Sequence, residues 1–284
     1  MDQEQLDAKL KDHRLWQETN GKSGKRARFV QTQLNHLTGL RGIDFSGCLF
    51  SHSILIGLDF TDCNLIGARF HHSVLDYSTF NNAKMAGVDL SYAKGKHVTA
   101  IGADMTKAKM ACFQLDNSNL TKSTIDGVTV TKGHDSNGWH MVVLDDASAV
   151  DAKFVELGVS CMYGRRADFA RAEFAECKIT NSLFHEAKMA NADFHSSDIR
   201  ASTFKKATLN GASFAWAEAK GNSFEEADLT DTDFRDANLK DCNMRKVTCD
   251  RTDFEGAEVH RMKVKGMNYH VANLCDAQIK LLIP

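Results

Sequence analysis

Proline is almost missing from this chain: the single one among 284 residues is Pro284. Without internal proline, and without a serine-rich or low-complexity segment, the sequence offers no linker between domains, which favours one continuous body. No run of about 18 apolar residues exists to span a membrane, and the N-terminal segment is charged where a signal peptide would be apolar. We therefore expect a cytoplasmic protein without membrane contact, and delivery as a secreted effector stays open.

Cysteine pairs of the CxxC type are also absent, although the chain has eight cysteines. Their irregular spacing favours reduced cysteines that pack in the interior over disulfides or zinc ligands. The sequence contains no nucleophile elbow, phosphate-binding loop, dinucleotide fingerprint or HExxH motif. These absences predict a protein that is not an enzyme and that needs no cofactor or metal. The formal net charge of −2 gives no overall bias toward nucleic acid or membranes.

A five-residue repeat fills most of the chain and is clearest in FEEADLTDTDFRDANLKDCNM, which ends at Met244. A large apolar residue recurs at most of the fifth positions from Phe45 to Val130 and, in a second register, from Phe154 to Ile279. We call this residue the centre of its repeat; a small residue usually precedes it by two positions. Neither the helical period of 3.6 nor the strand period of 2 keeps the centres on one side, so the chain must turn once every five residues.

This motif closely resembles that of the pentapeptide-repeat family, whose members coil four pentapeptides per turn into a right-handed quadrilateral β-helix. The resemblance covers about residues 27–280 and implies an all-β fold, a right-handed, four-sided parallel β-helix of about twelve coils. If four repeats make a coil, residues 20 positions apart stack on one another. One column then contains Phe154, Phe174, Phe194, Phe214, Phe234 and Phe254, and the opposite column contains Phe184, Phe204 and Phe224.

The repeats divide the chain into three parts. We predict an N-terminal helical cap over residues 1–26, the β-helix over 27–280 and an apolar C-terminal tail over 281–284. A one-residue slip occurs near residue 35, and a loop at about 131–143 breaks the register. Solenoid ends expose core and strand edges unless they are covered. The tail therefore either folds over the last coil or forms a homodimer contact, and we favour the homodimer.

Trp139 and several histidines are candidate surface residues outside the repeat core. The segment TKGHDSNGWH contains turn-forming residues, and Trp139 is a costly side chain to leave on a loop tip. We favour a Trp139 that folds back on the shaft and keep a partner contact open. His134 and His140 are further candidates for partner contact. Two histidines without a third ligand do not indicate a metal site. The 20-residue spacing of His52 and His72 predicts that they stack on the surface.

The outward positions predict two other kinds of surface. In the N-terminal half, Ile54, Ile56, Val74 and Tyr77 form an apolar patch that suggests a protein interface. In the C-terminal half one face is acidic and the opposite face is basic, so we expect an electrically two-sided rod. The acidic candidates for partner contact are Glu173, Asp193, Asp233, Asp236 and Asp253, and the basic candidates are Arg165, Arg166, Lys205 and Lys206.

These features favour a non-enzymatic scaffold or adaptor that binds a protein partner through the faces of the rod. The alternative, implied by the quinolone-resistance members of the family, is imitation of duplex DNA to occupy a topoisomerase such as DNA gyrase. We favour the protein partner, because only one face is acidic and the net charge is near zero. Direct nucleic-acid binding is not expected, since the basic face lacks interleaved aromatic residues that would stack on bases.

Overall fold

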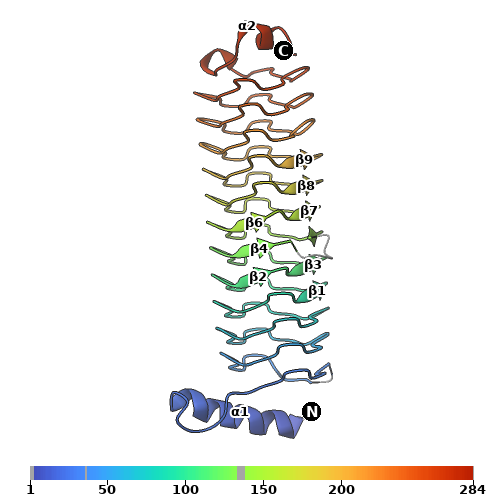
Figure 1. The fold of residues 1–284 in the computed structure, drawn as a ribbon, viewed down its shortest axis with the longest axis vertical. Helices are drawn as coiled ribbons and strands as arrows, with labels where there is room; N and C mark the ends of the chain where they lie inside the picture. The colour runs from blue at the N-terminus through green and yellow to red at the C-terminus, as the bar shows by residue number, and fades with distance from the viewer. Residues whose placement is uncertain (1–2, 36, 133–137, 284) are drawn as a thin grey trace.

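The computed structural model describes residues 3–35, 37–132 and 138–283 and shows a long rod of stacked coils (Figure 1). Helix α1 (Gln3–Glu18) lies across the N-terminal end of the rod, and the short helix α2 (Asp276–Ile279) lies at the C-terminal end. None of the helices in the described segments is long and apolar enough to cross a bilayer. The remaining elements are β1 (Lys94–Lys96), β2 (Lys109–Ala111), β3 (Gln114–Asp116), β4 (Thr129–Thr131), β5 (Trp139–His140), β6 (Lys153–Val155), β7 (Gly158–Ser160), β8 (Lys178–Thr180), β9 (Asp198–Arg200) and the 3-10 helix η1 (Tyr269–Val271).

Successive coils pair in parallel, and most paired residues are 20 positions apart. One ladder connects thirteen successive coils, from Arg28 to Asn273. The regular strands belong to two such ladders, ordered β1-β3-β5-β7-β8-β9 and β2-β4-β6. Four repeats of five residues account for the 20-residue step, so the predicted parallel β-solenoid is confirmed.

Two coils depart from the 20-residue step. In the first coil Arg28 pairs with Leu49, 21 positions on, which confirms the predicted one-residue slip. Later, Leu115 pairs with Trp139, 24 positions on, so this coil holds four extra residues. The chain is back in the ladder at Trp139, because β5 pairs with β3 and β7. The break in the register is therefore shorter than the predicted loop at 131–143.

Each corner of a coil is a tight turn at the residue two positions after a centre. The backbone N–H of Ser73 donates to the carbonyl oxygen of Phe70 at 3.0 Å, which closes a four-residue turn around His72. His72 has a φ of 57°, in the left-handed region that is typical of the third residue of a type II turn. Glycine, asparagine and aspartate tolerate this region best, which explains why the sequence places them so often at corners.

The interior consists of columns of stacked side chains. The ring of Phe174 lies 4.6 Å from that of Phe154 and 4.9 Å from that of Phe194, nearly parallel to both. Across the shaft, Phe204 meets Phe214 edge-on at 5.7 Å. Stacked and edge-on arrangements are the two that aromatic pairs prefer. The predicted phenylalanine columns on opposite sides of the shaft are thus confirmed.

Small inward residues two positions before the centres add hydrogen bonds between coils. The Cys177 thiol donates to the carbonyl oxygen of Phe154 at 2.8 Å, and the Ser73 hydroxyl donates to that of Phe50 at 2.7 Å. Burial raises the pKa of the Cys242 thiol to about 12, so this side chain stays protonated and unreactive at neutral pH. The inward cysteines therefore serve the packing of the coils.

Helix α1 closes the N-terminal end of the rod. Leu6 and His13 are its buried residues, each at most 1% exposed. The backbone N–H of Ala27 donates to Nδ1 of His13 at 3.3 Å, so the ring carries its proton on Nε2, which donates to the carbonyl oxygen of Ser46 at 2.9 Å. Burial lowers the pKa of His13 and keeps the ring neutral. The neutral imidazole thereby ties the helix to the first coils.

At the other end, the regular coils stop earlier than the predicted boundary at residue 280. η1 and α2 replace the last repeats, and Leu274 and Ile279, which the pattern places inside, are only partly buried. The physical reason is that no further coil within the described residues lies above them to complete their burial. The tail nevertheless stays on the rod, because Ile283 pairs with Lys263 and its N–H donates to the carbonyl oxygen of Met262 at 2.8 Å.

Candidate protein-binding surface

One edge of the rod carries a row of stacked, exposed rings. His52, His72 and Tyr92 occupy the same corner of three successive coils, each in the left-handed backbone region. The His72 ring stacks on His52 with centroids 4.9 Å apart and on Tyr92 with centroids 4.8 Å apart. His71 meets His72 edge-on at 4.3 Å. The row is therefore already ordered before any partner binds.

An apolar strip lies beside this row. Ile54 and Val74 pair in one ladder and are half-buried, and Ile56 is half-buried on the same side. At the next corner Tyr77 is 60% exposed and stacks on His97 with centroids 4.9 Å apart. The apolar residues predicted from the sequence thus lie together with the rings. We call this side of the rod the ring-bearing surface; its residues are His52, Ile54, Ile56, His71, His72, Val74, Tyr77, Tyr92 and His97.

The imidazole of His72 stays uncharged at neutral pH. Desolvation lowers its pKa, and the neighbouring His71 and His52 lower it further, because adjacent imidazolium ions would repel one another. A neutral histidine behaves as an aromatic ring with one donor and one acceptor nitrogen. Nowhere in the described segments do three His, Cys, Asp or Glu side chains gather closely enough to hold a metal ion. The row therefore offers rings and hydrogen bonds to a partner.

A groove of about 620 Å³ continues the ring-bearing surface across β1, β3 and β5. Its lining includes Val74, Lys96 of β1 and Asp116 of β3. His140 of β5 lies against Asp116, with its Nδ1 2.9 Å from Oδ1. The groove combines both signs of charge with apolar side chains, so it adds a polar section to the ring-bearing surface. His140, a predicted contact residue, lines this section.

Trp139, in contrast, belongs to no exposed surface. Its side chain is fully buried at a centre position. The indole Nε1–H donates to the carbonyl oxygen of Phe113 at 3.2 Å, and the ring meets Phe154 edge-on at 5.6 Å. The interpretation of Trp139 as a partner contact is therefore wrong: the indole fills the core and its polar group is satisfied there. His134 lies outside the described residues.

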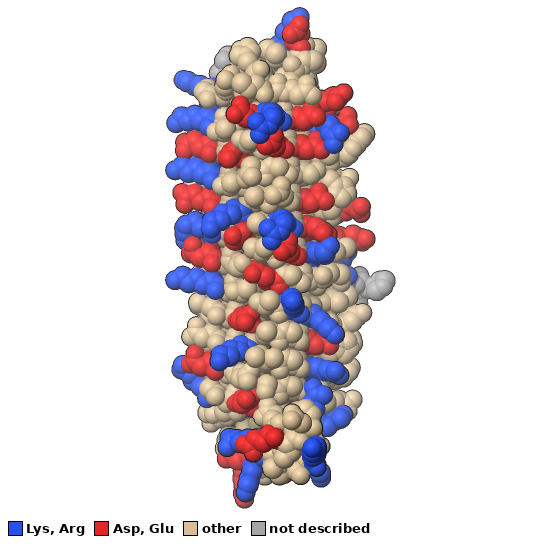
Figure 2. Space-filling view, turned by 90° about the vertical axis from the view of Figure 1, so that its left-hand side faces the viewer, with Lys and Arg blue, Asp and Glu red and all other residues tan. Residues whose placement is uncertain are grey.

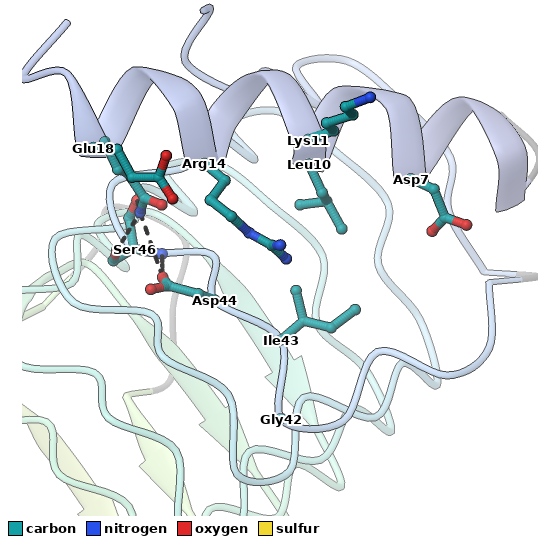
Figure 3. Close-up of a pocket in the computed structure, with 10 residues that line it drawn as sticks. Asp7, Leu10, Lys11, Arg14, Glu18, Gly42, Ile43, Asp44 and Ser46 are labelled. Carbon is teal, nitrogen blue, oxygen red and sulfur yellow. Dashed lines mark hydrogen bonds between the residues drawn. The ribbon is translucent and has the colours of Figure 1, made fainter.

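A second groove, of about 1080 Å³, separates α1 from the first coils (Figure 3). Leu10 of the helix faces Ile43 across it, and Arg14 extends from the helix into it. At its closed end Nε2 of Gln17 donates to the hydroxyl oxygen of Ser46 at 2.6 Å. Side chains of both signs line the rest of the groove and favour no single ligand class: Asp7, Lys11, Glu18 and Asp44.

Ion pairs between adjacent coils offset part of the charge of the predicted basic face. The guanidinium of Arg166 donates to the carboxylate of Asp146 and holds the pKa of that carboxyl below its usual value. Each basic candidate has such a partner; the pairs are Arg165–Asp145 at 2.6 Å, Arg166–Asp146 at 2.8 Å, Lys205–Glu225 at 3.5 Å and Lys206–Glu226 at 3.8 Å.

Four of the five acidic candidates for partner contact also have ion-pair partners. Arg235 lies 2.8 Å from Asp233 and 3.8 Å from Asp253, and its guanidinium lowers the pKa of Asp233. Glu173 pairs with Lys153 and Asp193 pairs with His195. Asp236 is the fifth candidate and has no ion pair within residues 3–35, 37–132 and 138–283.

Ion pairs between coils therefore offset part of the charge of both predicted faces, and the electrically two-sided rod stays a prediction. Figure 2 shows Lys and Arg side chains alternating with Asp and Glu along an edge of the upper half of the rod. The ion pairs show such an alternation at Glu226, which pairs with Lys206 on one neighbouring coil and with Lys246 on the other. Alternation places opposite charges above one another, which avoids the repulsion between like charges on adjacent strands.

Sequence reasoning does not single out Trp216, which is 67% exposed. The repeat register places it two positions after the centre Phe214, at the same kind of corner as Tyr92. A search of the corner positions for large aromatic side chains would have found it.

A comparison with curated proteins found no match. Among solved structures the chain is similar to HetL, a pentapeptide repeat protein involved in heterocyst differentiation regulation from the cyanobacterium Nostoc sp. strain PCC 7120, with 20% identity over 82% of this chain and 94% of HetL and a TM-score of 0.33. It is also similar to trypsin-treated QnrB1, a plasmid-mediated fluoroquinolone resistance protein, with 15% identity over 71% of this chain and 89% of that one and a TM-score of 0.32.

The family model for pentapeptide repeats matches eight copies, at residues 40–65, 63–94, 167–205, 200–236 and 223–261, which together make up more than half of the chain. These segments lie within the coils, where the structure shows a corner every five residues and mostly a stacked partner every 20. The chain therefore belongs to the pentapeptide repeat family.

Proposed function

We propose that this protein is a non-enzymatic scaffold or adaptor that binds a protein partner on its ring-bearing surface. The observation that carries the proposal is the ordered row of His52, His72 and Tyr92 beside Ile54 and Val74. Aromatic side chains are enriched at the centres of protein interfaces, and rings that are already ordered lose little entropy on binding. Pentapeptide repeat proteins are generally non-catalytic repeat scaffolds, which agrees with this role.

The alternative function, occupation of a topoisomerase such as DNA gyrase by imitation of duplex DNA, has less support. It needs a continuous negative surface, whereas Asp233 and Asp253 share Arg235 and the corner at Glu226 alternates in sign. A gyrase supercoiling assay separates the two functions. We expect neither inhibition nor protection from a fluoroquinolone at micromolar protein, and either effect would favour DNA imitation.

Affinity capture with quantitative mass spectrometry tests the ring-bearing surface. The variant combines Tyr77→Asn and Tyr92→Asn, and both positions have a left-handed φ that asparagine tolerates well, so the fold is kept. The matched control is Ile66→Asn, because Ile66 is 47% exposed, as Tyr92 is, but lies on a different corner. We expect the partner to be recovered with the wild type and the control and reduced at least fivefold with the double variant. Equal recovery with all three proteins would contradict the proposal.

We also infer a homodimer through the C-terminal end. Val271, Leu281 and Ile283 are 42%, 44% and 41% exposed there, next to the last of the described coils. Exposed apolar side chains and strand edges favour association. Light scattering should give twice the mass of the 31.5 kDa chain, and Leu281→Lys should restore the monomer. A wild-type protein that stays monomeric at 100 μM would contradict the inference.

A further inference from the structure

Trp216 is a large, exposed aromatic side chain that does not contribute to the core of the rod. At 67% it has the highest exposed fraction among the exposed large apolar side chains of the described residues. Its φ is 62°, in a region that disfavours bulky side chains and suits Asn, Asp or Gly. Within the described part of the chain its ring has neither a stacking partner nor a cation above it. Packing therefore does not explain a tryptophan at this corner.

Two carboxylates without a cationic partner lie beside Trp216. The backbone N–H of Trp216 donates to the carbonyl oxygen of Arg235 at 2.9 Å, which places Asp236 at the same corner on the next coil. Glu218 follows Trp216 by two residues on the adjoining side, where its two oxygens accept from Nδ2 of Asn238 at 2.9 and 3.1 Å. Neither carboxylate takes part in an ion pair with any described residue.

On the far side from Trp216, the carboxylate of Asp236 lies against a glycine. The same corner one coil further holds Gly256, because the N–H of Asp236 donates to the carbonyl oxygen of Glu255 at 2.9 Å. A Cβ on Gly256 would collide with Oδ1 of Asp236, so the carboxylate turns toward the glycine. Both residues are exposed. The corner thus presents an indole, a carboxylate without an ion pair and a glycine on three successive coils.

We propose that Trp216, Glu218 and Asp236 bind an arginine side chain from a basic segment of a protein partner. A cation is attracted to the face of an indole more strongly than to any other aromatic side chain. The planar guanidinium both stacks on a ring and donates to carboxylates, which a lysine ammonium does less well. The charge complementarity therefore selects arginine.

This arginine site is separate from the ring-bearing surface. Trp216 and Tyr92 lie on the same edge of the rod, but six coil spacings of about 4.8 Å put them about 29 Å apart. A long partner can occupy both sites, whereas a short peptide tests each one alone.

An NMR titration of the full-length, ¹⁵N-labelled protein tests the arginine site. The probe is the capped peptide Gly-Arg-Gly-Arg-Gly, compared with versions that carry lysine or citrulline, the uncharged isostere of arginine. The chain has three tryptophans and hence three indole N–H signals, of which Trp216→Phe identifies one. We expect the Trp216 signal to shift and saturate with the arginine peptide, to shift less with lysine and to stay in place with citrulline, while the signals of Trp16 and Trp139 do not move.

Charge variants separate a local site from general attraction of a cation to the rod. Asp236→Asn should weaken binding of the arginine peptide roughly 3- to 10-fold. Asp250→Asn is the matched control, since it removes the same charge from an exposed residue at another corner, and it should change the affinity less than twofold. Tyr92→Asn, on the ring-bearing surface, should leave the affinity for the arginine peptide unchanged. Failure of the arginine site is therefore distinguishable from failure of the proposed function. Equal shifts with citrulline, equal weakening by Asp250→Asn, or no shift at 10 mM peptide would each overturn the proposal.

Discussion

Replacing Trp139 with alanine tests whether the chain re-enters the core directly after the four extra residues. The side chain is fully buried, and a tryptophan of this kind removes about 200 Å² of surface from water. At about 25 cal/mol per Å² this burial corresponds to about 5 kcal/mol as an upper bound. Core Trp→Ala substitutions cost about 3–5 kcal/mol, and loss of the hydrogen bond to the Phe113 carbonyl adds about 1 kcal/mol. We expect Trp139→Ala to lower the free energy of unfolding by about 4–5 kcal/mol.

Urea unfolding followed by far-UV circular dichroism measures this loss. Trp139→Phe keeps a ring edge-on to Phe154 but removes the N–H donor, so it should cost about 2 kcal/mol. Trp216→Ala is the matched control, because the same substitution at a residue that is 67% exposed should change stability by less than about 0.5 kcal/mol. If Trp139→Ala costs no more than Trp216→Ala, the indole does not fill the core and the account of this coil is refuted.

Three other side chains give further tests. Burial lowers the pKa of His13 below its unfolded value of about 6.5, so the unfolded chain binds more protons. The stability that His13 contributes is therefore complete above that pH and is lost as the pH falls below it. The difference in melting temperature between wild type and His13→Asn should shrink from pH 7.5 to pH 5, and a constant difference would be inconsistent with this. The hydroxyl of Ser123 is buried without a hydrogen-bond partner among the described residues, so Ser123→Ala should raise the free energy of unfolding in urea by about 0.5–1 kcal/mol rather than lower it. Lys206→Glu places its new carboxylate between Glu186 and Glu226 on the neighbouring coils, so the melting temperature should fall, and 0.5 M NaCl should recover most of the loss if the cause is electrostatic.

The coil itself follows from the sequence because one pattern repeats along the whole shaft. Each centre from Phe154 to Phe254 has an equivalent 20 positions away, and the same packing requirement applies to every one of them. The surface patch with Ile54 and Val74 follows for the same reason, since the register fixes which positions face outward. Repetition therefore makes both the core and the outward positions predictable.

The pairing of charges was missed for a specific physical reason. Counting the charges of a whole face together hides their order from coil to coil, and Arg166 is neutralised by Asp146, which is 20 positions away on the neighbouring coil. Reading each corner position separately, in steps of 20, shows the alternation through Lys206 and Glu226. The order of the charges along one corner, from coil to coil, decides which of them are paired, and the summed charge of a face does not show it.

No sequence pattern indicates the contacts that lie outside the repeat. His13 reaches the Ser46 carbonyl 33 positions along the chain, and neither residue carries a local signal for this contact. Trp139 follows an insertion, so the register on one side of the break does not fix the side-chain position on the other. Both depend on how far the chain between two ladder positions can reach, which only the three-dimensional structure supplies.

Hydroxyl-radical footprinting of the protein with and without its captured partner tests the protein-binding surface most directly, because it reports the exposure of individual aromatic side chains. We expect Tyr77 and Tyr92, which are 60% and 47% exposed in the free protein, to react several-fold more slowly in the complex. Leu15, which is 44% exposed on the far side of α1, should react equally in both samples. Unchanged reactivity of both tyrosines in a complex that has formed would contradict the assignment of binding to the ring-bearing surface.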